Sequence, residues 1–422
     1  MAQIIPFRGY TYNPETVDIE SALAPPYDVV KQDERDRFCR ENPFNILRLE
    51  LPDSPLEVVR ELFSSWINAG VIQKDREESL YPYEIQFELN GVNVTRTGLI
   101  CLLKVEPWER RVVLPHEKTF KKVTRERLEL LKTVRAQFSQ IFLLSKDLKQ
   151  LSHALKWEGR DLLFHCRDHL GNLHRVFKIS DRDVIDVITA PFADRSLYIA
   201  DGHHRYTTAL TFREECERTG LFRGVNPPPH EYVMAYIVDT SDPGLICQPT
   251  HRAVRLEGLE AGEVKTRLAR YFDTVVELND LESLETLDDY LEKYSSTPSF
   301  FVIFLNQGKA VLYALNGQGR ALLDARKLTG PMSELDVTVV DEIAIRETFM
   351  AGAGELKERG MLCYEARTQD LMKGVLSHKI IFYLRPTSVD SMLRVAEAGL
   401  TMPHKATYFS PKILTGSVIR EL

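Results

Sequence analysis

In this 422-residue chain a short apolar strand leads into a tight polar turn, and this combination limits the possible folds. Residues 197–200 form the predicted strand, and residues from 206 onward have the composition of a helix. Between them lies Asp201-Gly202-His203-His204-Arg205, where the glycine permits a tight turn and a close approach of the backbone. A strand, a turn and a helix in this order predict an α/β protein.

The turn carries the groups that bind a phosphate. The first amides of a helix have no intrahelical partner and carry the positive end of the helix dipole. An anion placed there would meet backbone N–H groups, the guanidinium of Arg205 and the imidazoles of His203 and His204. Asp201 would bind Mg²⁺ or take a proton. Alternatively, the turn has only a structural role, with Asp201 as an N-cap and Arg205 as its surface partner. Two histidines and an arginine in one turn favour a functional role.

Composition excludes several classes of protein. The net charge of −7 disfavours nucleic-acid binding, which depends on neutralising phosphates with Lys and Arg. No apolar run approaches the roughly 20 residues that span a bilayer. The six cysteines are scattered and no secretory leader begins the sequence, so we expect a soluble protein with reduced thiols in the cytoplasm. P-loop, Rossmann, nucleophile-elbow and zincin motifs do not occur.

The length predicts two or three domains of about 150 residues each. A helix is expected to open at Ser54-Pro55, another to run from 125 to about 140, and hairpins to turn at Asn90-Gly91 and Leu170-Gly171-Asn172. A new pattern of helices and strands follows Val254. We therefore divide the chain into domains 1–253 and 254–422, with an aromatic-rich C-terminal tail that docks on the body.

Three further polar segments are candidates for the site. Glu117, in His116-Glu117-Lys118-Thr119, would act as general base toward a hydroxyl if it lies near the phosphate, although a solvated loop explains it equally well. In Thr250-His251-Arg252, the arginine would bind a phosphate, or the segment is a surface loop without such a role. The C-terminal segment would bring two lysines to an anionic ligand. The candidate catalytic residues are Glu117, Asp201 and His204, and the candidate binding residues are Gly202, His203, Arg205, His116, Thr119, His251, Arg252, Lys405 and Lys412.

The turn Asp201–Arg205 resembles that of the ParB/sulfiredoxin superfamily, whose members bind nucleotide or phosphate at a strand, a glycine turn and a helix. Its D-G-x-H-R form is similar to that of the free serine kinases, which phosphorylate L-serine rather than protein. Over nearly its whole length the chain also resembles a large bacterial family of conserved proteins of unknown function. The matching segments are residues 24–29, 42–43, 114–119, 135, 200–205, 250–252 and 403–412.

The resemblance implies a mixed α/β fold, with a ParB/sulfiredoxin-like core and insertions in residues 1–253 and a further α/β domain in 254–422. It also implies that Asp201, His204 and Arg205 form the phosphate- and metal-handling turn. An upstream glutamate serves these kinases as base, and Glu117 is the candidate here.

The function that follows is a phosphotransferase acting on a small hydroxyl substrate, chiefly free L-serine. ATP, ADP or pyrophosphate would be the donor, with Mg²⁺ as cofactor, and phosphoserine dephosphorylation would be the reverse reaction. The alternative is a nucleotide-binding regulator akin to ParB, although the net charge argues against DNA as its partner. A sulfiredoxin-like reductase would need a cysteine at position 203, which is histidine. The oligomeric state stays open.

Overall fold

The computed structural model describes residues 1–148, 151, 154–279, 284–366 and 379–422. Contacts divide the chain into two compact units. Unit 1 comprises Met1–Pro115, Thr119–Ile246 and Phe409–Leu422, and unit 2 comprises His116–Lys118 and Cys247–Tyr408. The division thus falls earlier than residue 254, within strand β13 (Ile246–Gln248), and again within β20 (Tyr408–Ser410). The last residues belong to unit 1 rather than to a C-terminal domain.

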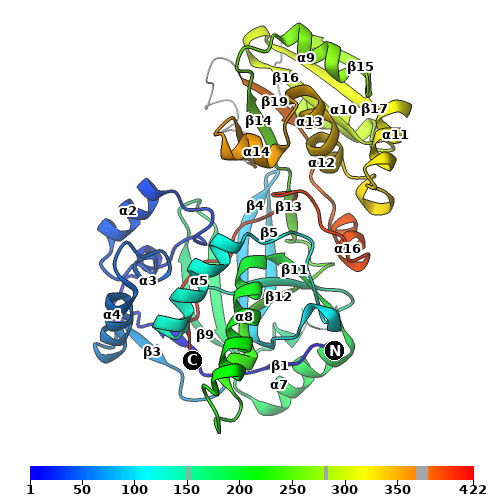
Figure 1. The fold of residues 1–422 in the computed structure, drawn as a ribbon. Helices are drawn as coiled ribbons and strands as arrows, with labels where there is room; N and C mark the ends of the chain where they lie inside the picture. Colours follow the sequence, from blue (N-terminus) through cyan, green and yellow to red (C-terminus); the bar gives the residue numbers. More distant parts are fainter. Residues whose placement is uncertain (149–150, 152–153, 280–283, 367–378) are drawn as a thin grey trace. The chain divides into compact units, whose positions relative to one another are not determined.

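Within the described residues, nine strands of unit 1 form one sheet, in the order β6-β11-β8-β12-β5-β4-β10-β9 with β1 beside β5 (Figure 1). Strand β11, which carries the polar turn, is parallel to β6 and antiparallel to β8. The bounds are β1 Ile4–Ile5, β4 Tyr81–Leu89, β5 Val92–Lys104, β6 Val113–Leu114, β8 Ile141–Ser145, β9 Asp161–Arg167, β10 Leu173–Lys178, β11 Leu197–Asp201 and β12 Tyr232–Asp239.

Both predicted hairpins are confirmed. Asn90 and Gly91 have φ of 51° and 78°, as a two-residue turn with positive φ at both positions requires, and they join β4 to β5. Gly171, with φ of 86°, lies in the turn between β9 and β10. A separate two-stranded sheet pairs β2 (Tyr10–Tyr12) with β3 (Ile72–Lys74).

The helices of unit 1 follow their apolar periodicity, with two corrections. The first expected helix begins at Leu56 with Pro55 as its N-cap, one residue later than predicted. Helix α5 ends at Val134 rather than near 140, because Ala136–Gln137 form strand β7 and pair with β21 at the C-terminus. The bounds are α1 Ile19–Ala22, α2 Gln32–Glu41, α3 Leu47–Glu50, α4 Leu56–Asn68, α5 Lys121–Val134, α7 Arg182–Thr189, α8 His203–Thr219 and β21 Arg420–Glu421.

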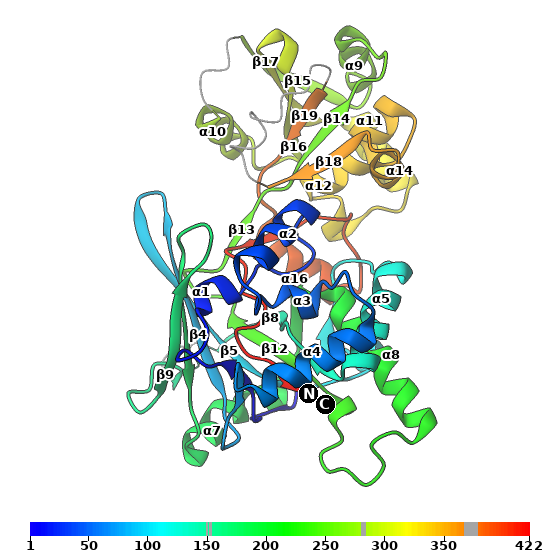
Figure 2. The same cartoon turned by 90° about the vertical axis from the view of Figure 1, so that its left-hand side faces the viewer.

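Helices α5 and α8 lie side by side in both views of the fold (Figures 1 and 2). Leu128 and Leu131 of α5 pack against Phe212 and Cys216 of α8, and all four are buried. This contact holds the second half of α8 against α5 within unit 1.

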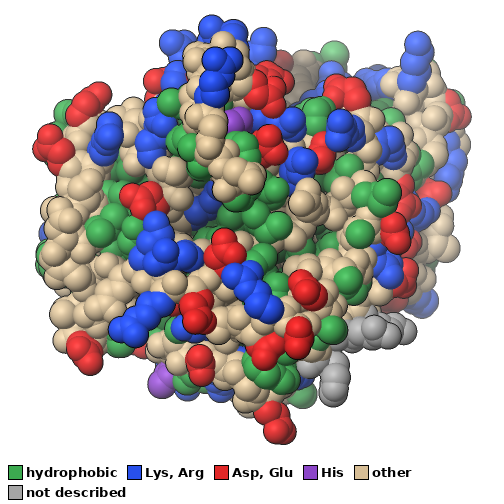
Figure 3. Space-filling model, turned by 90° about the horizontal axis from the view of Figure 1, so that it is seen from below, with side chains coloured by type: hydrophobic (Ala, Val, Ile, Leu, Met, Phe, Trp, Pro, Cys, Tyr) green, Lys and Arg blue, Asp and Glu red, His purple; other side chains and the backbone are tan. Residues whose placement is uncertain are grey.

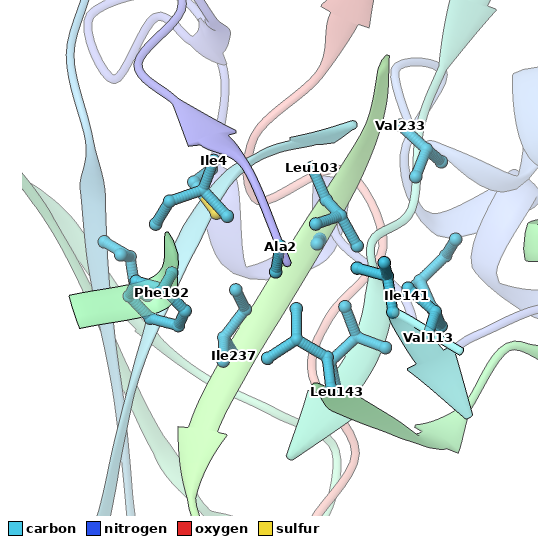
Figure 4. Close-up of a cluster of buried hydrophobic side chains, with 14 of the residues drawn as sticks. Ala2, Ile4, Leu103, Val113, Ile141, Leu143, Phe192, Val233 and Ile237 are labelled. Carbon is cyan, nitrogen blue, oxygen red and sulfur yellow. The ribbon is translucent and has the colours of Figure 1, made fainter. Parts of the chain in front are cut away.

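One hydrophobic cluster of unit 1 lies on one face of the large sheet. Side chains from β5, β8 and β12 meet there, together with the N-terminal strand and the segment that follows α7 (Figure 4). Each large aliphatic side chain buried in this way contributes about 1.5–3 kcal/mol to folding. The residues labelled in the figure are Ala2, Ile4, Leu103, Val113, Ile141, Leu143, Phe192, Val233 and Ile237.

In the described part of unit 2, six strands form a sheet in the order β15-β17-β16-β19-β14-β18. The pattern of helices and strands expected after Val254 is confirmed, since Leu268 and Leu287 lie in helices and β16 forms a hairpin with β17. Both units combine sheets with helices, so the mixed α/β class is confirmed. The bounds are β14 His251–Arg255, α9 Ala261–Leu268, β15 Phe272–Asn279, α10 Glu285–Lys293, β16 Ser299–Phe304, β17 Lys309–Leu315, α11 Gly317–Ala325, α12 Asp336–Val339, a π-helix Val340–Ile345, α13 Arg346–Phe349, α14 Ala353–Glu358, β18 Leu362–Glu365, β19 Lys379–Tyr383 and α16 Val389–Glu397.

The surface carries charges of both signs. On the face drawn in Figure 3, acidic and basic side chains alternate rather than gathering into patches of one sign. The six cysteines are all free thiols, and four of them are buried. Among the helices of the described residues, none has both the length and the apolar composition needed to cross a bilayer.

Candidate functional site

Strand β11 delivers Asp201 directly to the start of α8, and a single residue, Gly202, separates them. Gly202 is the N-cap of the helix and has φ of +92°, a left-handed conformation that glycine adopts without steric cost. A Cβ at this position would lie 3.0 Å from Nε of Arg205. The helix begins at His203 rather than near Tyr206, so both histidines and Arg205 lie in its first turn.

Two positive side chains flank the carboxylate of Asp201. Nζ of Lys412 lies 2.7 Å from Oδ2, and Nη2 of Arg205 lies 3.9 Å from Oδ1, which also accepts a hydrogen bond from the amide of Gly202. The Lys412 and Asp201 side chains are only 14% and 19% exposed. Lys412 was predicted to reach an anionic ligand, and in the structure the anion that it meets is Asp201.

Asp201 was also the predicted metal ligand. In the described parts of the chain, no three or more His, Cys, Asp or Glu side chains cluster as a metal site. Asp201 therefore offers one carboxylate, already paired with Lys412, rather than a ready-made cage for a cation.

Arg205 is the most constrained group of the turn. Its side chain is 11% exposed, and Nη1 donates to the carbonyl of Gln140. Burial alone would lower the pKa of the guanidinium, but the negative charges around it, chiefly Asp201, raise that pKa. Nε is buried and has no hydrogen-bond partner among the described residues. A buried donor without a partner costs about 1–3 kcal/mol, a cost that an anionic ligand at the turn would remove.

The two histidines have defined surroundings. His203 is buried in the first turn of α8. Nε2 of His204 accepts a hydrogen bond of 3.0 Å from the amide of Phe120, and the two rings stack with their centroids 5.9 Å apart. Because Nε2 accepts, neutral His204 carries its proton on Nδ1 and presents a donor there. Thr119, half-buried, precedes Phe120 in unit 1.

A small cavity of about 60 Å³ lies beside Arg205 and is lined by residues that the sequence analysis missed. Glu50 forms its charged wall, and burial raises the pKa of this carboxyl, whose Oε1 accepts a 3.0 Å hydrogen bond from Ser139. Arg127 donates to the carbonyl of Glu50 and lies over the ring of Tyr27. Ligand pockets measure about 300–1,000 Å³, so this cavity is too small to hold such a ligand by itself. The segment that contains Tyr27 was the only sequence signal for it.

A second group of predicted residues comes together in unit 2. Oε1 of Glu117 accepts a hydrogen bond of 3.1 Å from the amide of Lys405 and lies 2.6 Å from Nδ1 of His404. Nε2 of His116 lies 3.0 Å from the hydroxyl of Thr407, and the His116 carbonyl accepts from the amide of Met402. Glu117 is thus part of an ordered network rather than of a solvated loop. His404 lies in the segment 403–412 that carries the resemblance, but it was not among the candidate site residues.

Arg252 and His251 require correction, because neither lies on a surface loop and both have partners within unit 2. Arg252 is fully buried and binds Asp341 through two hydrogen bonds of 2.8 and 3.0 Å. Its remaining N–H groups donate to the carbonyls of Thr250, His404 and Lys405, so all five donors are used and none is left for a phosphate.

His251 is equally buried. It stacks on Tyr383 at 4.1 Å, and its Nδ1 accepts a hydrogen bond from the amide of Leu384. Burial, together with the charge of Arg252, lowers the pKa of His251 to about 3, so the ring is neutral. His251 therefore packs the core of unit 2 instead of binding an anion.

The predicted site residues therefore form two groups, each inside one unit. Unit 1 holds the phosphate turn with its lysine, and unit 2 holds the glutamate with the segment that follows α16. In unit 1 they are Thr119, Asp201, Gly202, His203, His204, Arg205 and Lys412, and in unit 2 they are His116, Glu117, His251, Arg252 and Lys405.

Comparison with known proteins identifies one matching family. The model described as "Protein of unknown function (DUF1015)" matches residues 4–338. No curated protein matches the chain.

Several solved structures are similar at low identity. They include a mutant free serine kinase in complex with ADP (10% identity, TM-score 0.38), which covers 74% of this chain and 87% of its own. A conserved hypothetical protein from Pyrococcus furiosus matches at 14% identity and a TM-score of 0.36, over 76% of this chain and 94% of its own. SbnI from Staphylococcus aureus, truncated at its C-terminus, matches at 10% identity and a TM-score of 0.36, over 75% of this chain and 85% of its own. Likenesses this weak support no conclusion about the present chain.

Proposed function

The chain belongs to the DUF1015 family of proteins of unknown function, and we propose that it is a phosphotransferase that binds its phosphoryl donor at the turn Asp201–Arg205. The observation that carries this proposal is the start of α8. A left-handed glycine there precedes a 17-residue helix, and a buried charged arginine with an unsatisfied Nε lies in its first turn. The helix dipole, the backbone amides and the guanidinium all favour an anion at this position.

The reaction would transfer a phosphoryl group from ATP, ADP or pyrophosphate to a small hydroxyl compound such as free L-serine. In such transfers the protein mainly positions the partners and stabilises the charge on the phosphoryl oxygens. Arg205, Lys412 and the Nδ1–H of His204 are the donors suited to that role. The reverse reaction, dephosphorylation of phosphoserine, would use the same groups.

Asp201 offers Mg²⁺ one carboxylate at this site. Magnesium is commonly held by one or two carboxylates together with phosphate oxygens, and Asp201 is the carboxylate that would hold it here. When bound, the ion would supply further neutralisation of the phosphate charge. Lys412, which pairs with Asp201 in the structure, already contributes one positive charge.

Phosphorus NMR on the purified protein, with L-serine, Mg²⁺ and each donor in a separate tube, tests the proposal. A phosphoserine resonance with one donor would establish the reaction and identify the donor. Asp201→Asn should abolish turnover without changing the circular dichroism spectrum, whereas Asp194→Asn, an exposed carboxyl of the same unit, should turn over like the wild type. Wild-type turnover in Asp201→Asn would refute the assignment, and nucleotide binding without transfer would favour the regulator instead.

A further inference from the structure

We propose that Arg96 is a positioning residue that holds Lys412 beside Asp201 through the backbone of the C-terminal segment. This inference rests on the proposed function, in which Lys412 contacts the phosphoryl donor, and it gives a role to a residue that the sequence analysis did not select. Arg96 is fully buried in β5, and two strands, β12 and β8, separate β5 from β11 in the sheet. Arg96 therefore influences the turn through residues that lie between them.

The guanidinium of Arg96 binds the backbone just before Lys412. Nη2 donates to the carbonyl of Pro411 at 2.5 Å, and Nη1 donates to the carbonyl of Ser410 at 3.4 Å. A guanidinium presents its donors in a fixed planar fork, so two successive carbonyls are bound in one orientation. The next residue, Lys412, places Nζ 2.7 Å from Oδ2 of Asp201. The fork thus fixes the backbone that carries the lysine to the carboxylate.

Two aromatic rings hold this guanidinium in place. Its Cζ lies 5.1 Å from the ring centroid of Phe142 and 5.9 Å from that of Tyr236, within the range of a cation–π contact. Phe142 also meets Phe409 edge to face, with the centroids 5.6 Å apart. In the sheet, Phe142 of β8 is the register partner of Asp201. The strand that packs against Arg96 is therefore the strand that pairs with the end of β11.

A buried guanidinium also needs a compensating charge, and Asp242 supplies part of it. Oδ2 of Asp242 accepts a hydrogen bond of 3.1 Å from the amide of Thr97, and Oδ1 accepts one of 2.8 Å from the amide of Gly244. Burial raises the pKa of Asp242, while these amides and the charge of Arg96 act in the opposite direction. Asp242 thus balances the charge, and the donors Nη1 and Nη2 are directed to the C-terminal segment.

The segment is anchored separately on the other side of Lys412. The amide of Leu414 donates to the hydroxyl of Tyr83 at 3.2 Å, and the amide of Gly416 donates to the carbonyl of Phe138 at 2.8 Å. These anchors do not involve the guanidinium. Removing it therefore releases the side that precedes the lysine, so the segment should stay docked while the ammonium group moves away from the carboxylate.

Chemical modification tests the positioning role without turnover or ligand. Brief acetylation with acetic anhydride, followed by mass spectrometry, measures the reactivity of each lysine. Lys412 is 14% exposed and paired, so it should react slowly in the wild type. In Arg96→Met it should react about tenfold faster relative to the exposed Lys31, as loss of a hydrogen bond between charged groups implies. Arg175→Met, which changes an arginine of β10 that binds Gln86, should leave Lys412 at its wild-type rate.

A double-variant cycle tests whether Arg96 acts through Lys412. Titration calorimetry with ATP, ADP and pyrophosphate measures the affinity for each donor. Lys412→Met should weaken binding by about 10–100-fold, as expected for a hydrogen bond between charged groups. Arg96→Met should weaken binding by no more than this, and the double variant should bind as weakly as Lys412→Met alone. Effects that multiply in the double variant would show that Arg96 acts independently of Lys412 and would overturn the proposal.

The two proposals fail separately. Wild-type reactivity of Lys412 in Arg96→Met, with an unchanged circular dichroism spectrum, would overturn the positioning role while the proposed function stands. If Arg96→Met does not fold, Arg96→Lys takes its place, because it keeps the charge but lacks the planar fork, and wild-type reactivity there has the same meaning. Absence of donor binding and of phosphoserine would refute the proposed function, and faster acetylation of Lys412 would then still support the positioning role of Arg96.

Discussion

Replacing Asp341 by asparagine should destabilise unit 2 strongly, because the change removes one charge from a fully buried pair. Arg252 and Asp341 have side chains that are 0% and 4% exposed and share hydrogen bonds of 2.8 and 3.0 Å. Hydrogen bonds to charged groups contribute about 1.5–3 kcal/mol each, so weakening two costs about 3–6 kcal/mol. Removing one partner of a buried ion pair typically costs about 3–5 kcal/mol, which agrees with that range. We therefore expect Asp341→Asn to lose about 4 kcal/mol.

Urea denaturation measures this loss. The free energy of unfolding falls by about 2 kcal/mol for each M of urea, so the unfolding midpoint of unit 2 should fall by about 2 M. The three tryptophans, Trp66, Trp108 and Trp157, all lie in unit 1, so their fluorescence follows that unit while circular dichroism follows both. Asp273→Asn, at an exposed carboxyl of unit 2, should change stability by less than about 0.5 kcal/mol. A shift of less than about 0.5 M in Asp341→Asn would show that the Arg252–Asp341 pair does not stabilise unit 2 to this extent.

Two further predictions concern the turn and the core of unit 2. Gly202→Ala should weaken nucleotide binding more than tenfold by calorimetry, because the new Cβ at a φ of +92° would displace Arg205; unchanged affinity would contradict the assigned turn. For His251, burial lowers the folded-state pKa to about 3, whereas the unfolded value is near 6.5. The unfolded chain therefore binds the proton first, and the contribution of neutral His251 is complete above pH 6.5 and lost as the pH falls toward 3, at up to about 1.4 kcal/mol per pH unit. His251→Gln should remove this slope in unfolding curves measured between pH 7 and pH 5, and an identical slope in both proteins would show that His251 is not the group responsible.

Local signals in the sequence predicted the elements of both units well. The hairpin at Asn90-Gly91 needed only a pair of residues that accept positive φ between two alternating strands. The phosphate turn was equally local, because one glycine between an apolar strand and a helix allows few conformations. The helix expected to reach residue 140 shows the limit of this approach. Its last residues form strand β7, whose partner β21 comes from the C-terminal end of the chain.

The candidate site divides in the same way. The tight turn that places Asp201 and Arg205 around Gly202 could be predicted from the chain alone, because backbone preferences act over a few residues. The folded structure alone brings Lys412, 211 residues away in sequence, to Asp201. It also paired Glu117 with His404. Such contacts depend on strand order and on the packing of distant segments, and sequence periodicity carries no information about which distant side chains these bring together.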